Sequence, residues 1–177
     1  MRGCCRTVLL GVGSLALACG CAPEETETPP ALELTGRVVD AAEILDEQFE
    51  KNLTQRLELL EQDTNVQLVI ATIPDLQGYD ISDYGYQLGR DWGIGDAERN
   101  DGLMILVAPN ERKVRIEVGL GLEGLVKDEE AAEIIRTGIL PKFRTGDFEN
   151  GISQGVDGLI VEVTPIEPKP AELKEAA

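Results

Sequence analysis

Between Gly36 and Val163, short apolar runs alternate with longer segments in which apolar residues recur every three or four positions. Residues 65–73 and 102–108 are rich in branched apolar side chains and nearly free of charge, which predicts strands covered on both faces. In residues 114–119 apolar and charged positions alternate, as in a strand with two different faces. The turn at 109–113 makes the last two strands an antiparallel hairpin. The strand, helix and strand before it predict a right-handed parallel crossover.

Four segments carry the apolar spacing of amphipathic helices. In the first, Phe49, Leu53 and Leu57 fall at intervals of four and share one face. The third is expected to stop at Pro141, because proline cannot continue a helix. The capping or first residues expected for the four helices are Asp46, Asp80 or Ser82, Asp128 and Asp147. Together these elements predict an α/β fold class with a small mixed β-sheet between helical layers.

The two ends of the chain have a different composition and divide it into four parts. Residues 1–21 read as an export signal with a lipobox, and residues 22–35, rich in Pro, Glu and Thr, read as a flexible tether. Residues 36–163 form the one expected domain, and residues 164–177 form a second polar, Pro-rich tail that we expect to be disordered. The only membrane anchor expected from this pattern is N-terminal.

The export signal combines two basic residues, Arg2 and Arg6, with an apolar stretch over residues 7–18. This stretch is too short for an ordinary membrane span, which needs about 20 residues. Two cysteines, Cys19 and Cys21, end sequences that resemble a bacterial lipobox, and the glycine before Cys21 favours that cysteine for lipidation. Simple secretion by cleavage after Ala18 is the alternative. Lipidation predicts a membrane-anchored lipoprotein that faces the periplasm or the cell exterior.

The charge balance indicates which partners the domain could bind. The chain has 33 Asp and Glu against 16 Lys and Arg, and its formal charge of −17 becomes −19 when Arg2 and Arg6 are left out. Such a surface repels phosphodiester backbones, so we expect no nucleic acid partner, and it attracts cations. The alternative is that most of these carboxylates only keep an exported domain soluble.

Two residue types are missing from the expected domain. All four cysteines lie within the first 21 residues, and the chain has no histidine. These absences exclude Ser-His-Asp and Cys-His nucleophilic sites in this chain, together with the zinc and copper sites that depend on His and Cys ligands. Carboxylate and carbonyl oxygen chemistry remains.

Several separated motifs resemble the TPM domain family from about Arg37 to Val163. They are VVDAAEIL, WGIG followed by NDG, the pattern R-x-E-V-G-x-G-L-E, and FRTGDFENGI, in that order. The resemblance implies a three-layer α/β/α sandwich. The family includes plant thylakoid-lumen proteins described as acid phosphatases in photosystem II repair, a nematode receptor modulator, and bacterial exported proteins. Metal binding, chiefly of Ca²⁺, has been associated with its acidic cleft. Fold transfers well within such a family, whereas activity does not.

Carboxylates near the expected strand ends suggest where a cation would bind. We expect the segments that carry them to meet at one end of the sheet and to supply the oxygen ligands that Ca²⁺ prefers, with Mg²⁺ as the second choice. Gly119, Gly121 and Gly124 would let the backbone bend close to the ion. The candidate ligands are Asp101, Glu117, Glu123, Asp128, Asp40 and Asn100. Each has a simpler alternative role, because Asp40 and Asp128 suit helix caps and residues 100–102 suit a turn.

Two classes of function follow from this pattern. In the first, the lipid-anchored domain is a binding or modulator module that uses a Ca²⁺-organised cleft to dock an unknown envelope protein. In the second, it is a metal-dependent acid phosphatase that hydrolyses phosphomonoesters with metal-activated water, with Arg112, Lys113 or Arg115 contacting phosphate. No Asp-x-Asp-x-Thr nucleophile motif is present, and the negative field opposes phosphate binding. The sequence therefore favours the binding module and identifies no catalytic residue.

Overall fold

The computed structural model describes residues 32–164 of the chain. The predicted export signal, the candidate lipidated cysteines and the C-terminal tail lie outside the described residues. In chain order the elements are β1 (Val38–Asp40), α1 (Glu47–Thr64), β2 (Gln67–Thr72), α2 (Ile81–Trp92), β3 (Gly102–Ala108), β4 (Lys113–Val118), the 3₁₀ turn η1 (Leu120–Leu122), α3 (Asp128–Ile134), the π-helical turn η2 (Ile135–Ile139), α4 (Leu140–Phe143) and α5 (Phe148–Val163). Among the described residues, no helix is long and apolar enough to cross a membrane.

The four strands form one mixed sheet in the order β1-β2-β3-β4. β1, β2 and β3 run parallel, while β4 returns antiparallel to β3 through the hairpin that the sequence predicts. All three parallel strands therefore end at one end of the sheet, which we call the carboxyl end. β2 and β3 begin, and β4 ends, at the opposite end, which we call the amino end.

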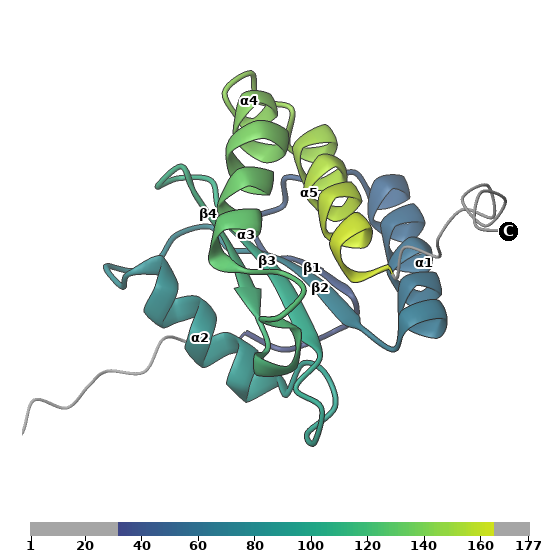
Figure 1. Ribbon diagram of the computed structural model, residues 1–177. Coiled ribbons are helices and arrows are strands. Elements are labelled where there is room, and N and C mark those ends of the chain that lie inside the picture. The colour runs from purple at the N-terminus through teal and green to yellow at the C-terminus, as the bar shows by residue number, and fades with distance from the viewer. Residues whose placement is uncertain (1–31, 165–177) are drawn as a thin grey trace, which may run out of the picture.

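Two apolar clusters, one on each face of the sheet, form the core. The alternation along β3 is the clearest example, because Leu103, Ile105 and Val107 belong to one cluster while Met104 and Leu106 belong to the other. The first cluster packs under α1, α3 and α5, and the second packs under α2. Figure 1 shows these helices on opposite sides of the sheet, which gives the three layers of an α/β/α sandwich. Burial of both faces explains why β3 is apolar at every position.

Three helices begin at residues that the sequence identifies as caps. Asp46 accepts a hydrogen bond from the N–H of Gln48 at the start of α1, and Asp80 accepts one from Ser82 at the start of α2. Asp147 caps α5 in the same way, through the N–H of Asn150. Each cap satisfies a backbone donor that has no partner within its own helix. Asp80, rather than Ser82, is therefore the cap of α2.

The prediction that the third helix stops at Pro141 is wrong. The helix passes through η2, where the N–H of Leu140 bonds to the carbonyl of Ile135, five residues earlier, and it continues to Phe143. Proline lacks an N–H and cannot donate to the preceding turn. Here it occupies the first turn of α4, directly after the wider π-helical turn, where proline is tolerated. Spacing alone cannot reveal a change in helical pitch.

The amino end of the sheet depends on two backbone segments that lie unusually close. The N–H of Gly119 donates to the carbonyl of Gly102 at 2.8 Å, and the N–H of Gly121 donates to the carbonyl of Asn100 at 3.0 Å. A Cβ atom on Gly121 would overlap the carbonyl oxygen of Arg99, whereas one on Gly124 would meet no atom within 4 Å. The absence of a side chain at Gly121 is therefore what allows the chain leaving β4 to pack on the chain entering β3.

We predict that Gly121→Ala lowers the free energy of unfolding by about 1–3 kcal/mol, because the added methyl forces two backbones apart. Gly124→Ala is the matched control, and it should change stability by less than about 0.5 kcal/mol. Urea denaturation of both variants measures the difference. Equal stability of the two variants would show that the contact between the segments is not a constraint on the fold.

Candidate functional site

The predicted ligands do not share one end of the sheet. Asn100 and Asp101 precede β3, and the carbonyl of Asn100 accepts from the segment that leaves β4, so these two segments meet at the amino end as expected. Asp40 is the last residue of β1 and pairs in register with Thr72, the last residue of β2. It therefore lies at the carboxyl end and does not join the others. Parallel strands run in one direction, so residues that end one strand and begin another lie at opposite ends.

Asp101 is buried and fully engaged by the backbone and side chains around it. One carboxylate oxygen accepts from the N–H of Asp96 at 2.7 Å, and the other accepts from the Nε of Arg99. The side chain is only 10% exposed. Desolvation acts to raise the pKa of Asp101, but the hydrogen bonds from Asp96 and Arg99 outweigh it, and the pKa falls below its ordinary value. Asp101 thus holds the loop before β3 in place.

Three more predicted metal ligands, Asn100, Glu123 and Asp128, lie in different local environments. Asn100 adopts a left-handed backbone conformation with φ of 51°, which asparagine tolerates better than most residues. Glu123 is exposed just after η1, and Asp128 is the exposed first residue of α3. The carboxylate of Glu130, not that of Asp128, accepts from the N–H of Lys127 at the start of this helix. Asp128 is therefore not the cap that its position suggests.

Glu117 points away from the surface toward α2. Its carboxylate pairs with the Nε of Arg115 on the same strand, and its side chain is 19% exposed. A Cβ atom on Gly85 of α2 would lie only 2.5 Å from Oε1 of Glu117, so the helix makes room for this carboxylate at a glycine. Burial raises the pKa of Glu117, and the ion pair with Arg115 only partly offsets that effect. Glu117 therefore lies between β4 and α2, where it contacts Arg115 and lies beside Gly85.

At the carboxyl end, Asp40 organises the turn between β1 and α1. One of its oxygens accepts from the hydroxyl of Thr72, and the other accepts from the N–H of Leu45 at 2.9 Å. Asp40 therefore caps the backbone shortly before α1, while Asp46 caps the helix itself. Asp40 is therefore not the helix cap that the sequence offers as its simpler role, although both of its oxygens are used in holding this turn.

The six candidate residues do not fit a single metal site in this conformation. The carboxylates of Asp40, Asp101 and Glu117 are each occupied by hydrogen bonds, and the first lies at the opposite end of the sheet from the second. Across residues 32–164, no group of three or more Asp or Glu side chains converges as a metal site would require. Gly119 and Gly121 also have another purpose, because they permit the backbone contact at the amino end.

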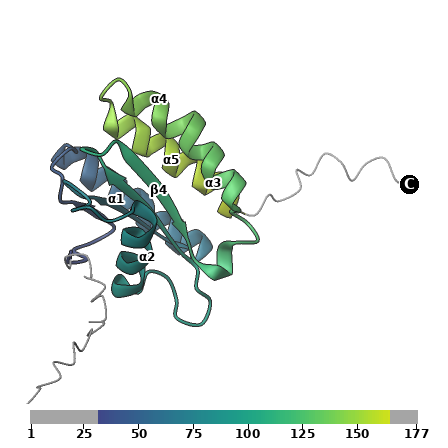
Figure 2. The same ribbon diagram turned by 90° about the vertical axis from the view of Figure 1, so that its left-hand side faces the viewer.

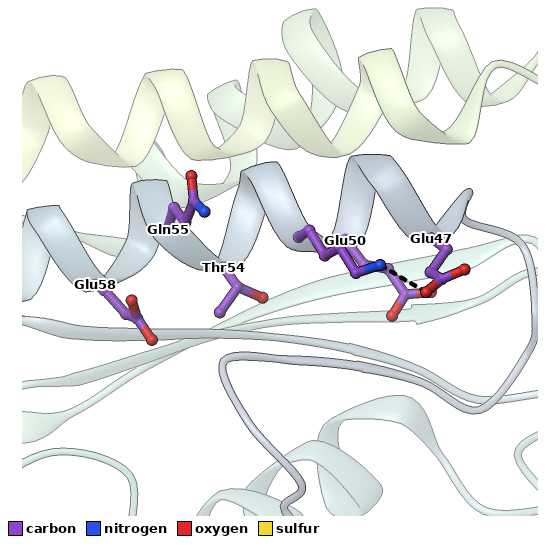
Figure 3. Close-up of a pocket in the computed structure, with 6 residues that line it drawn as sticks. Glu47, Glu50, Thr54, Gln55 and Glu58 are labelled. Carbon is purple, nitrogen blue, oxygen red and sulfur yellow. Dashed lines mark hydrogen bonds and ion pairs between the residues drawn. The ribbon is translucent and has the colours of Figure 1, made fainter.

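A second acidic region lies along α1 and includes none of the six candidate ligands. Figure 3 shows a shallow pocket whose lining includes Glu50, Thr54 and Glu58, which project from α1 at intervals of four. Burial raises the pKa of Glu50, and the carboxylates of Asp40, Glu47 and Asp46 raise it further. The full lining is Glu47, Glu50, Lys51, Thr54, Gln55 and Glu58. We call this set the acidic face of α1.

The acidic face of α1 carries three Glu side chains and one cation, Lys51. Lys51 pairs with Glu47 at 2.6 Å, but its effect on the pKa of Glu50 is smaller than that of the surrounding carboxylates. The spacing of Glu50, Thr54 and Glu58 was visible in the sequence. It was indistinguishable there from the ordinary polar side of an amphipathic helix. The proximity of Asp40, which lies outside the helix, becomes apparent only in the folded chain.

We predict that Asp101→Asn lowers the free energy of unfolding at pH 7 by about 1.5–3 kcal/mol, because hydrogen bonds to a charged, buried carboxylate are lost. The lowered pKa of Asp101 means that this stabilisation is complete above the unfolded value near 3.9 and is lost as the pH falls through the folded value. The difference from the unmodified protein should therefore shrink below about pH 4.

Denaturation of both proteins between pH 7 and pH 3 measures this effect, with Glu123→Gln as an exposed control in the neighbouring segment. The control should change stability by less than about 0.5 kcal/mol at any pH. Equal losses in the two variants would contradict the structural role assigned to Asp101.

Comparison with known proteins identifies the family. The family model of the TPM domain matches residues 38–162. A similar solution NMR structure is the N-terminal domain of a protein from P. gingivalis, with 31% identity and a TM-score of 0.67, covering 72% of this chain and 82% of that one. The BA42 protein of Bizionia argentinensis has 19% identity and a TM-score of 0.60 over 68% and 82% of the two chains.

The N-terminal domain of the cg2496 protein from Corynebacterium glutamicum has 12% identity and a TM-score of 0.59, covering 78% and 87% of the two chains. This structure and that of BA42 show only the shared fold, because their identity to this chain is low. No curated protein matches the chain. The family match covers most of the chain and agrees with the separated motifs, so the chain belongs to the TPM domain family.

Proposed function

We propose that this protein is an exported, lipid-anchored binding module whose TPM domain docks a cationic partner of the cell envelope on the acidic face of α1. The observation that carries the proposal is the pocket along α1, whose lining holds Glu47, Glu50 and Glu58 against the single cation Lys51. Burial and the nearby carboxylates of Asp40, Glu47 and Asp46 raise the pKa of Glu50, which agrees with this excess of negative charge. Carboxylates crowded in this way repel one another, and a cationic group bound among them relieves that repulsion. Such a surface steers a positively charged partner and rejects anionic ones.

The direction in which the chain enters the domain supports this arrangement. The carbonyl of Leu32 accepts from Nε1 of Trp92 at 2.6 Å, at the end of α2 and close to the amino end of the sheet. Leu32 lies eleven positions after Cys21, so a lipid on Cys21 would hold Leu32 within about 40 Å of the membrane. α1 begins at the carboxyl end, so its acidic first turns lie at the opposite end of the sheet from the point where the chain enters the domain.

Enzyme activity receives less support from the same contacts. Two of the three basic residues considered for phosphate binding already face carboxylates: Lys113 lies 3.9 Å from Asp80, and Arg115 pairs with Glu117. A phosphate would have to compete with these partners in a negative field. The binding module is therefore the function that the geometry supports best.

We predict that a photo-crosslinking residue at Thr54, placed in the full chain in its native envelope, forms a covalent adduct with one envelope protein. Changing Glu47, Glu50 and Glu58 together to Gln should abolish the adduct, because these carboxylates provide the attraction. High salt should weaken it for the same reason. Mass spectrometry of the adduct identifies the partner and shows whether its contact surface is basic.

The matched control places the same crosslinker at Thr137, which is exposed on η2. Adducts at both positions, or an adduct at Thr54 that survives the three Glu-to-Gln changes, would contradict docking on the acidic face of α1.

Calcium binding stays a prediction from the sequence, now without a defined set of ligands. If Ca²⁺ binds the native state, a free concentration 100 times the dissociation constant adds about 2.7 kcal/mol and raises the melting temperature by several degrees. Because Asp40 and Asp101 lie at opposite ends of the sheet, Asp40→Asn and Asp101→Asn should not both remove this increase. Melting curves with and without millimolar Ca²⁺ test the prediction, and no increase in the unmodified protein would reject calcium as a ligand.

A further inference from the structure

β4 is the strand at one edge of the sheet, and its outer side has no strand partner within residues 32–164. Figure 2 shows β4 facing the viewer between α2 on one side and the α3–α5 layer on the other. The backbone hydrogen bonds of the described residues include none on the outer side of this strand. An open edge of six residues is a template for another strand.

The register with β3 identifies which backbone groups point outward. Gly119 donates to the carbonyl of the opposite residue, Gly102, which makes them a hydrogen-bonded pair. In an antiparallel ladder such pairs alternate with pairs that are not hydrogen-bonded. Lys113, Arg115 and Glu117 therefore direct their backbone groups toward β3. The backbone groups of Val114, Ile116 and Val118 point away from the sheet.

We propose that the open edge of β4 pairs antiparallel with the β4 strand of a second copy of this chain, about a twofold axis at Ile116. In this register Ile116 faces its own copy and Val114 faces Val118 of the second copy, so the outward-pointing residues form the hydrogen-bonded pairs. Arg115 then lies opposite Glu117 of the second copy, on the α2 side, and the reciprocal pair forms across the axis. The two four-stranded sheets join into one sheet of twice the size.

The order of charges along β4 is what selects a second copy as the occupant. Charged residues on an edge strand usually prevent pairing, because like charges meet across it. In β4 a positive and a negative residue stand symmetrically about Ile116, so an antiparallel twofold brings opposite charges together at both positions. Arg115 and Glu117 already form an ion pair within one copy. Pairing therefore exchanges partners between copies and leaves neither charge isolated.

The apolar residues beside the edge agree with this register. Val114, Ile116 and Val118 lie on the side of the sheet that packs under α3 and α5, where they contact the first apolar cluster. A single pair of six-residue strands buries a small area, so we expect dissociation constants in the micromolar range or weaker.

The test uses sedimentation equilibrium of the full chain with its four cysteines, all within residues 1–21, changed to Ser. Neither lipidation nor a disulfide bond can then cause two copies to associate. Arg115→Glu brings two Glu pairs together across the twofold, and Glu117→Arg brings two Arg pairs together. Each variant alone should associate at least about fivefold more weakly than the parent chain. A one-to-one mixture should form a mixed dimer at close to the parent affinity, because each reversed charge again meets its opposite.

Neither chain in the mixture regains the ion pair between its own residues 115 and 117. Recovery of dimerisation in the mixture would therefore show that the charges act between copies and not within one copy. Lys113→Glu is the matched control: it makes the same change of charge on the same strand, but its residue would lie opposite Gly119 of the second copy. This control should weaken association less than Arg115→Glu does, because Glu117 of the second copy is only a diagonal neighbour of residue 113. Failure of the mixture to recover, or an equal loss in the control, would overturn the proposal.

A second measurement needs no substitution in β4, several of whose side chains are packed against the rest of the domain. In a mixture of ¹³C-labelled and unlabelled parent chains at millimolar concentration, intermolecular NOEs should connect the methyl groups of Val114 with those of Val118. A monomer at this concentration would overturn the proposal. So would protection of the outward amides of β4 in dilute protein, which would assign the edge to the terminal segments of the same chain.

Discussion

The close contact between the two backbone segments at the amino end of the sheet is the constraint on which much of this structure depends. The chain that leaves β4 lies directly on the chain that enters β3, with hydrogen bonds from Gly119 and Gly121 to the carbonyls of Gly102 and Asn100. No side chain fits at Gly121. This contact sets the start of β3, keeps Asp101 buried among its donors, and so directs an apparent metal ligand into a structural role.

The elements that could be predicted from the sequence are those set by local chemistry. Alternating and continuous apolar runs identify the strands, and Asp46 and Asp147 identify the starts of two helices, because each signal lies within a few residues of its effect. The missed features depend on contacts distant in sequence or on a subtle change of pitch. Pro141 follows a π-helical turn that no spacing reveals. The carboxylate pattern groups Asp40 with Asp101, although the parallel strand order sends them to opposite ends.

At the candidate site, too, the sequence predicts which residues come together but not what they do there. The sequence correctly brings the segments around Asn100 and Gly121 together, and it identifies glycine as the residue that permits close approach. It assigns that space to an ion, whereas the structure fills it with backbone. In contrast, Glu50 looks like an ordinary exposed helix residue in the sequence. Only the folded chain brings the carboxylate of Asp40 near it and creates the acidic face of α1.

In our account the two ends of the sheet have different roles. The amino end receives the chain near Leu32 and Trp92 and is fixed by glycine contacts and by Asp101. The acidic face of α1 begins at the other end and carries the surplus of negative charge. The most direct test is paramagnetic broadening by dilute Mn²⁺, which reports where a divalent cation concentrates on the protein. Our account predicts selective loss of amide signals from residues 46–58, and selective loss from residues 96–101 and 117–123 would contradict it.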